Sequence, residues 1–297
     1  MSLMIGSTLQ NAFHIASLAA RGEIALFRAF IRAFNSLGSN ALAQEYHGNR
    51  YQVKFSANRG SGRPVPRCEL CDVMIIHYPA GNPRAARVTF NQAKVSSNPL
   101  QCAPQVFAPY KFRANLEQWD LLSSRPSISA TTAKINLPAD LLSNALLPSV
   151  GTFGVFYPKG QGFDFAYFVA NGLNPLNNNY KPSGTLQWKT QIGQVRKIGH
   201  YDEITATCCT YTFGQSLELG LIGTPLQQVL YGSNGSTEMR IWLGRILSSL
   251  QKMHPDSELP NELVEGFELT REEPSRKVEL STPRAVVLVR TEHPLLS

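Results

Sequence analysis

The stretch DVMIIHY, residues 72–78, is the part of the chain that decides the fold. Its apolar residues occupy both alternating faces, as expected of a central strand that is buried between two layers. A turn at 79–83 leads to a second strand-like stretch, RVTFNQAKV at 87–95. Strands joined by a short turn pair antiparallel, so the sequence predicts a sheet built around residues 72–95.

The rest of the chain predicts both helices and strands. Residues 7–47 have apolar positions at helical spacing and predict two or three helices, of which 41–46 is the last, whereas alternation at 51–55 predicts a strand. Further helices are expected at 112–123, 137–147 and 236–253, further strands at 151–157, 163–169, 187–198, 205–213 and 284–290, and a long loop at 171–184. This pattern predicts an α/β (α+β) fold with a mixed central sheet flanked by helices.

Three polar side chains interrupt the apolar strands and are expected to converge. Gln92 and Lys94 lie two residues apart and therefore share a face, while antiparallel pairing brings Asp72 opposite that end of the second strand. Asp72 and the side-chain oxygen of Gln92 suit a hard cation, and Lys94 would orient a water or stabilise charge on a phosphate. The alternative is an ordinary turn aspartate beside an exposed lysine.

The segments ELCD, VMII and VTFNQAK together resemble the restriction-endonuclease-like, or PD-(D/E)XK, nuclease family. That family has an acid on one core strand and (E/Q)-x-K on the next, and the variant with Gln occurs in a branch that includes methyl-directed restriction enzymes. By this resemblance Asp72 matches the metal-binding Asp, Gln92 the (E/Q) position and Lys94 the catalytic Lys. The family core runs helix, three strands, helix, strand, an order that residues 39–123 and 151–157 match.

The resemblance implies an endonuclease that hydrolyses phosphodiester bonds with Mg²⁺ or Mn²⁺, held by Asp72 and Gln92. Double-stranded DNA is the expected substrate, and restriction or anti-phage defence the expected setting. Two cuts in a duplex need two active sites, so a homo-oligomer, a dimer or larger, is expected. The implied organisation is an N-terminal helical segment (1–38), a nuclease core (39–170) and a C-terminal extension (171–297) of the same or a second domain.

Two further acids are candidates for completing the site. Many family members carry a Glu on the helix before the first core strand, and Glu45 is placed for that role if 41–46 is helical. Glu69 lies three residues before Asp72, so on a continuous strand the two would face opposite ways. Glu69 therefore needs a bend or a bulge in order to join the site.

The charge distribution favours a polyanionic partner. The chain has a net charge of +7 and a pI near 9.2. A basic stretch without any acid consists of Arg50, Lys54, Arg59, Arg63 and Arg67. Clustered cations are what binding to phosphates requires, although a solvated basic surface would have the same composition.

The cysteines, the histidines and the hydropathy pattern argue against a zinc-binding, disulfide-rich, membrane-spanning or secreted protein. The five cysteines (68, 71, 102, 208 and 209) form no even framework, and Cys68-x-x-Cys71 lacks a second zinc half-site, so we expect reduced cysteines. His77, on the face opposite Asp72, is expected to be a core histidine. No run approaches the eighteen apolar residues that a membrane span needs, and the opening residues lack the basic region of a secretion signal. We therefore expect a cytoplasmic protein.

Two other functions remain open at this point. One is a nucleic-acid-binding module that has the nuclease fold without turnover, which the neutral Gln92 makes conceivable. The other is an enzyme acting on small molecules, in which case the resemblance is coincidental. Cleavage of a plasmid separates the first hypothesis from these two, and DNA binding at low salt separates the two from each other.

Overall fold

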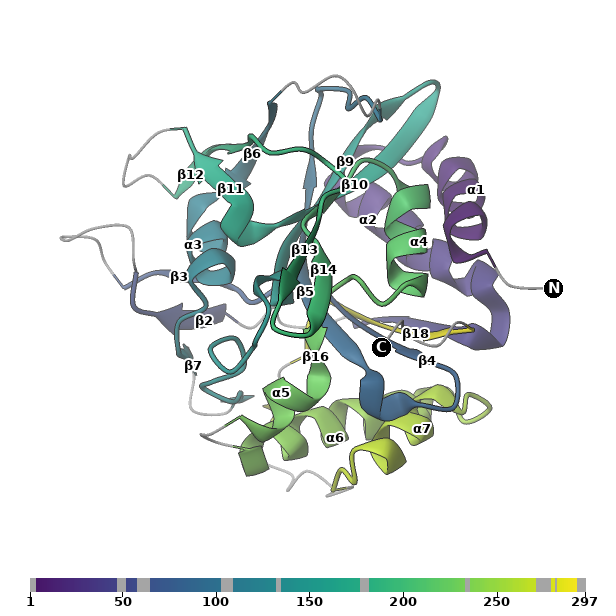
Figure 1. Ribbon diagram of the computed structural model, residues 1–297, viewed down its shortest axis with the longest axis vertical. Coiled ribbons are helices and arrows are strands. Elements are labelled where there is room, and N and C mark those ends of the chain that lie inside the picture. The colour runs from purple at the N-terminus through teal and green to yellow at the C-terminus, as the bar shows by residue number, and fades with distance from the viewer. Residues whose placement is uncertain are drawn as a thin grey trace.

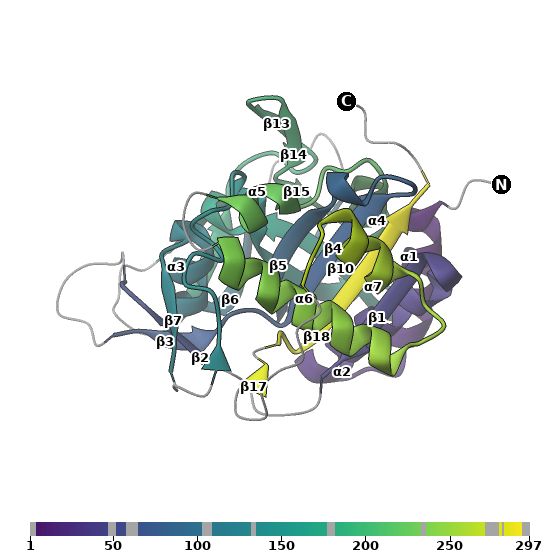
Figure 2. The same cartoon turned by 90° about the horizontal axis from the view of Figure 1, so that it is seen from below.

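The computed structural model describes residues 4–46, 52–57, 65–102, 109–131, 135–176, 182–232, 236–270, 279–280 and 282–292. It is a mixed α+β structure in which an eight-stranded sheet has helices on both faces (Figures 1 and 2). The order along the sheet is β1 (Ala41–Glu45), β18 (Ala285–Thr291), β4 (Val73–Pro79), β5 (Arg87–Val95), β9 (Gly151–Lys159), β10 (Gly162–Val169) and β15 (Ala206–Thr207), while β16 (Thr224–Pro225) pairs with β5.

The central strands run in both directions. β4 and β5 are antiparallel, as the turn between them predicts, and β9 lies parallel to β5 on the other side. β18 comes from the last part of the sequence but is inserted between β1 and β4, parallel to β4 and antiparallel to β1. The sheet therefore takes strands from both 39–170 and 171–297.

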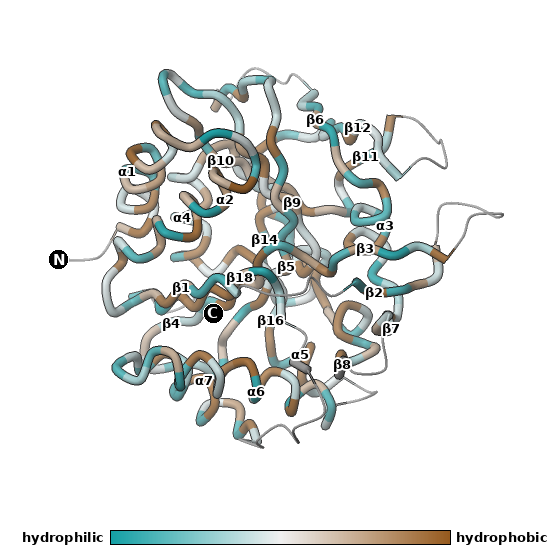
Figure 3. The backbone as a smooth tube through the Cα atoms, turned by 180° about the vertical axis from the view of Figure 1, so that it is seen from behind, coloured by the Kyte–Doolittle hydropathy of each residue, from teal (hydrophilic) through white to brown (hydrophobic). Residues whose placement is uncertain are grey.

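Each face of the sheet is covered by its own group of helices. α1 (Ile5–Ser17), α2 (Gly22–Ala33) and α4 (Thr210–Glu218) pack on the face that includes Val73 and Ile75. α6 (Ser236–Met253) and α7 (Leu259–Gly266) pack on the face that includes Met74 and Ile76. Helix α6 alternates between hydrophobic and hydrophilic residues along its length (Figure 3), as expected of a helix with one face on a core. Every residue of β4 is buried because both faces are covered.

Smaller sheets surround this core. They are β3 (Arg67–Glu69), β2 (Gln52–Phe55) and β7 (Ile128–Ala130); β11 (Leu173–Pro175), β12 (Ser183–Trp188) and β6 (Tyr110–Asn115); β13 (Val195–Ile198) with β14 (Tyr201–Ile204); and β17 (Glu279–Leu280) with β8 (Ile135–Asn136). The β13–β14 hairpin projects from the body of the molecule (Figure 2). The remaining helices are α3 (Leu116–Ser124), α5 (Leu226–Tyr231) and the 3₁₀ turns η1 (Phe34–Asn40), η2 (Pro83–Ala85), η3 (Pro148–Val150) and η4 (Ala170–Gly172).

Most of the long periodic segments have the secondary structure that they predict. The strands at 72–78, 87–95, 151–157, 163–169 and 284–290 and the helix at 236–253 are confirmed. The helix expected at 112–123 begins only at Leu116, because Asn115 ends β6 and its side chain accepts hydrogen bonds from the backbone N–H groups of Glu117 and Gln118. The expected helix at 137–147 consists mainly of turns instead. The expected strand at 187–198 is interrupted between Trp188 and Val195. The expected strand at 205–213 is mostly wrong, because only Ala206–Thr207 is a strand and helix α4 begins at Thr210.

Two predictions about the core strands are wrong. Residues 41–45 form the strand β1 rather than a helix, because their backbone groups pair with β18 along the whole segment. The strand predicted at 51–55 exists as β2, but it pairs with β3 and β7 and takes no part in the main sheet. β2 therefore cannot be the first of three core strands.

The cysteines differ from expectation as well. Cys102 and Cys208 form a disulfide, whereas Cys68, Cys71 and Cys209 are buried and take no part in a disulfide. The two bonded residues are 106 positions apart, and it is the tertiary structure that brings the segment after β5 beside the start of α4. In the described part of the chain, no helix has the length and apolar character needed to cross a membrane.

Candidate functional site

Asp72 lies directly before β4 and opposite Gln92 of β5. The backbone N–H of Asp72 donates to Asn91 O at 3.0 Å, which fixes this register. Asp72 and Gln92 are 4% and 2% exposed, respectively. Asp72 Oδ2 accepts a hydrogen bond from Gln92 Nε2 and another, at 2.9 Å, from the backbone N–H of Ala93. The acid and the amide that were predicted to converge are therefore in direct contact.

The other polar atom of Gln92 has no such partner. Gln92 Oε1 is buried, and no hydrogen bond to it is formed by the described residues. Leaving a buried acceptor unsatisfied costs about 1–3 kcal/mol, so such a group in a native structure calls for an explanation, for example a bound water or ion. The assignment of O and N in a side-chain amide follows from its neighbours. Nε2 faces the Asp72 carboxylate in the structure, so turning the amide over would bring Oε1 towards Asp72 Oδ2, an arrangement of two acceptors that only a bound cation would stabilise.

Lys94 lies near the end of β5, two residues beyond Gln92. Its side chain is 12% exposed, and Nζ is 3.8 Å from Glu23 Oε1 in the first turn of α2. Glu23 thus brings a third element, and a carboxylate that is itself 45% exposed, to this end of the sheet. Sequence reasoning did not select Glu23, because nothing in a helical pattern shows which of its polar residues will lie over the end of a strand.

Arg284 links the remaining acid to Asp72. It precedes β18 as Asp72 precedes β4, and the two strands are parallel neighbours. The Arg284 guanidinium lies 3.9 Å from Asp72 Oδ1 and 3.8 Å from Glu45 Oε1, and it is centred 4.8 Å from the Phe27 ring. Arg284 was also missed, because its place depends on the insertion of β18 next to β4.

Glu45 reaches this neighbourhood from a different element than expected. It ends strand β1, not a helix, and the expectation of a helical acid there is corrected. Arg28 of α2 donates to Glu45 Oε1 from Nε at 3.1 Å. Glu45 is therefore linked to Asp72 through Arg284, and no direct contact between the two carboxylates is observed among the described residues.

Glu69 belongs to β3, in the small sheet beside the site. The chain bends at 70–72, between β3 and β4, so the two acids do not lie on one continuous strand. Both are near the buried Cys71: burial raises the pKa of its thiol, and the charges of Asp72 and Glu69 raise it further. Glu69 is half-buried and lies opposite Gln52 of β2. It flanks the Asp72 site, and the bend that its candidacy requires is present.

The basic stretch is described only in part. Lys54 and Arg67 face each other across the β2–β3 pair, where Lys54 is half-buried and Arg67 exposed. Arg50, Arg59 and Arg63 lie outside the described residues. The two visible cations belong to the same small sheet as Glu69, next to the bend that leads into Asp72.

The site as a whole combines three acids and three cations at one end of the sheet: Asp72, Glu45 and Glu23 with Lys94, Arg284 and Arg28. Only Asp72 and Gln92 converge closely enough to share one cation. The described residues contain one group of three Cys, His, Asp or Glu side chains with ligand atoms within 4.8 Å of one another, and it is Cys102, Cys208 and Cys209 elsewhere in the fold.

Comparison with known proteins adds no relative. The chain matches no protein-family model, no curated protein and no solved structure.

Proposed function

We propose that the chain is a metal-dependent endonuclease that hydrolyses phosphodiester bonds in double-stranded DNA. The observation that carries the proposal is the buried contact between the Asp72 carboxylate and the Gln92 amide, whose Oε1 has no hydrogen-bond partner among the described residues. A carboxylate oxygen and an amide oxygen on facing strands fit a hard cation such as Mg²⁺ or Mn²⁺. Asp72 and Gln92 would hold this ion, which polarises a phosphoryl oxygen and lowers the pKa of a bound water.

The other side chains supply orientation and charge. Lys94 lies two residues beyond Gln92 on β5, 3.8 Å from Glu23, and in the proposed enzyme it would hold a water or stabilise negative charge on a phosphate. Glu23 sets the position of the Lys94 ammonium, and Arg284 sets that of the Asp72 carboxylate. These contacts come from three separate elements, so the side chains are fixed by the packing of the fold around them.

The arrangement of the elements supports the same proposal. β4 and β5 form an antiparallel pair, α3 follows, and β9 returns parallel to β5. This is the order of strand, strand, helix and strand that a restriction-endonuclease-like core would have. The neighbour of β4 on its other side differs: β18 lies there, parallel, and β1 follows beyond it. In the proposed fold β1 takes the place of the first core strand, displaced by one position.

Cleavage of supercoiled plasmid tests the proposal. With Mg²⁺ or Mn²⁺ the wild type is expected to nick or linearise the plasmid, and Asp72→Ala and Lys94→Ala are expected to cut at least about 100-fold more slowly. Matched controls are Asp202→Ala and Lys197→Ala, which remove the same side-chain types from the distant β13–β14 hairpin. Equal rates in all five proteins would contradict the proposal.

A second function is favoured by one observation. Asp72 is the only carboxylate in direct contact with Gln92 among the described residues, and a neutral amide binds a cation less tightly than a second carboxylate would. A nucleic-acid-binding module with this fold and no turnover would show that composition. It predicts that wild type and variants all bind DNA at low salt and that none cuts with either metal. Absence of binding at low salt would favour an enzyme acting on small molecules.

The proposed setting is restriction or anti-phage defence, and the proposed assembly is a homo-oligomer. Breaking both strands of a duplex requires two active sites, which a dimer would provide. Sedimentation equilibrium with and without a DNA duplex measures the assembly. A purely monomeric protein that nevertheless linearises plasmid in a single encounter would contradict the dimer.

A further inference from the structure

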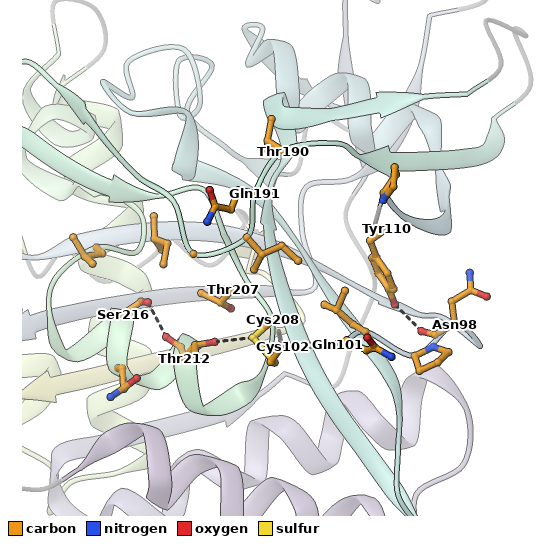
Figure 4. Close-up of a pocket in the computed structure, with 18 of the residues that line it drawn as sticks. Asn98, Gln101, Cys102, Tyr110, Thr190, Gln191, Thr207, Cys208, Thr212 and Ser216 are labelled. Carbon is orange, nitrogen blue, oxygen red and sulfur yellow. Dashed lines mark hydrogen bonds between the residues drawn. A yellow bond between two sulfur atoms is a disulfide. The ribbon is translucent and has the colours of Figure 1, made fainter. Parts of the chain in front are cut away.

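A cavity of about 1130 Å³ opens at the β15 edge of the main sheet (Figure 4). Its walls are residues 98–102 after β5, residues 109–111 at the start of β6, residues 190–193, and helix α4 with the strand residues that precede it. Sites for small molecules typically have volumes of roughly 300–1,000 Å³. The cavity is therefore large enough for a ligand with several rings, and none of the acids or cations of the Asp72 site lines it.

The lining combines apolar surface with uncharged polar groups. Leu100, Ile192 and Leu221 are only partly buried, and Leu219 is 48% exposed. Around them lie the side-chain amides of Asn98, Gln101, Gln191 and Gln215 and the hydroxyls of Thr190, Thr207, Thr212 and Ser216 (Figure 4). Among the described residues that line the cavity, none has a carboxylate and Lys111 is the single charged residue. An uncharged, flat ligand with both donors and acceptors on its rim would match these walls.

One lining group points to a ligand by itself. Thr207 is 1% exposed, and its hydroxyl has no hydrogen-bond partner among the described residues. Neighbouring polar groups are already engaged: Tyr110 Oη donates to Asn98 O at 3.0 Å, and Ser216 Oγ donates to Thr212 O at 2.7 Å. The Thr207 hydroxyl itself is closed to solvent in the structure, and a bound molecule whose edge reached it would satisfy it.

The wall of the cavity is held in place at both ends and lies close to the proposed catalytic strand. Ser96 donates its backbone N–H to Phe156 O at 2.8 Å, and the Asn98 amide donates to Lys111 O at 3.0 Å. The Cys102–Cys208 disulfide ties the far end to the start of α4. From Lys94 to Asn98 there are four residues, so at most about 14 Å of extended chain separates the Lys94 backbone from the cavity.

We propose that this cavity binds a nucleobase. The faces of the base would lie against Leu100, Ile192 and Leu221, its edge would reach Thr207 and the glutamine amides, and Lys111 would meet an attached phosphate. The choice of a nucleobase among uncharged heterocycles rests on the proposed nuclease function. The base has two sources, a free nucleoside or a base turned out of a strand next to the scissile phosphate.

The first arm of the test uses free nucleosides and metal-free Asp72→Ala protein, so that cleavage plays no part. Adenosine, guanosine, cytidine and thymidine are titrated by isothermal calorimetry. At least one nucleoside is expected to bind. In the double variant Asp72→Ala, Thr207→Val the affinity for that nucleoside should fall at least about tenfold, because one buried hydrogen bond is lost. Thr190→Trp, at an exposed position on the rim, should obstruct the entrance to the cavity and weaken binding at least about tenfold. Gln228→Ala, an exposed amide on α5, is the matched control and should bind unchanged.

The second arm uses a DNA duplex that carries 2-aminopurine, whose fluorescence rises when it leaves the stack. A rise with the Asp72→Ala protein that Thr190→Trp removes identifies a base from the strand, whereas binding in the first arm alone identifies a free nucleoside. No effect in either arm overturns the proposal even if the wild type cuts plasmid. Nucleobase binding without any plasmid cleavage would support the nucleobase site and contradict the proposed nuclease function.

Discussion

The β4–β5 pair carries a buried polar pair at each of its ends, and the two ends differ. At one end Asp72 lies opposite Gln92, and at the other His77 lies opposite Arg87. All four residues are at most 6% exposed. The partners of His77 and Arg87 are backbone carbonyls: His77 Nε2 donates to Ile222 O at 2.7 Å, and Arg87 Nη1 donates to Asp202 O at 2.8 Å.

This difference distinguishes two uses of buried polarity. At the His77 end the side chains fasten residues 202–223 to the sheet through hydrogen bonds to backbone carbonyls, which is a structural role. At the Asp72 end the side chains contact one another, and Gln92 Oε1 remains without a partner. His77 and Arg87 are held by hydrogen bonds to backbone carbonyls, whereas the Asp72 end keeps a buried acceptor that a bound cation would satisfy.

Removal of the Arg87 guanidinium should have the largest effect on stability. Arg87→Met keeps the length of the side chain but deprives the Asp202 and Gly223 carbonyls of their donor. We expect the free energy of unfolding to fall by about 4 kcal/mol, because hydrogen bonds from charged groups are strong and carbonyls would be left buried. Urea denaturation measures it. Arg113→Met, an exposed arginine of β6, is the control and should change stability by less than about 0.5 kcal/mol. A similarly small change in the free energy of unfolding for Arg87→Met would mean that the two ends of the β4–β5 pair do not differ in their contribution to stability.

His77 should make stability depend on pH in a defined window. Burial is the main reason that its pKa is lowered from 6.5 to about 4. Since the unfolded chain takes up a proton at higher pH than the folded one, stability is full above pH 6.5 and is lost as the pH falls towards 4. The shift corresponds to about 3 kcal/mol.

His77→Gln is the variant that isolates this effect. A glutamine keeps a donor for Ile222 O and does not titrate, so the wild type should lose more stability than the variant between pH 6.5 and 4. Unfolding free energies of the two proteins are compared at half-unit intervals of pH. If the unfolding free energies of the two proteins change in parallel with pH, His77 takes up a proton as readily in the folded state as in the unfolded state. The contrast between the two ends of the β4–β5 pair would then be lost.

Gln92→Glu should give the smallest change and the most informative one. A second carboxylate facing Asp72 without a metal should lower the free energy of unfolding by about 1–2 kcal/mol at pH 7, through repulsion between like charges. Added Mg²⁺ should restore this loss and raise the melting temperature more in the variant than in the wild type. Equal shifts in both proteins, or none, would mean that no cation binds between these two strands. Calorimetry with and without Mg²⁺ provides the comparison.

The sequence predicts the Asp72–Gln92 contact because only local rules are needed. A two-residue period sets which side chains share a face, and a short turn sets the antiparallel register. The same local rules place His77 on the face opposite Asp72, where it is the core histidine that was expected. The mixed sheet with helices on both faces also follows from local patterns, since apolar runs and helical periods alternate along the chain.

What the sequence does not predict depends on partners that are distant along the chain. Residues 41–45 form a strand because their backbone groups pair with those of β18. Arg284 reaches Asp72 because β18 is the neighbour of β4. The Cys102–Cys208 bond and the contact of Lys94 with Glu23 have the same origin. No period within 41–45 or 284–290 indicates which strand each will pair with.

The position of β18 has a consequence for how the protein is made. β1 and β4 are both synthesised early, yet the strand that joins them consists of residues 285–291. While a ribosome is still translating the preceding residues, the two early strands have unpaired edges, and Arg284 is absent from its place between Asp72 and Glu45. Pairings between such distant segments are slow to form, and the open edges of a nascent chain favour association with other chains. The charged cluster therefore assembles only after residues 284–291 have been synthesised and β18 has paired with β1 and β4.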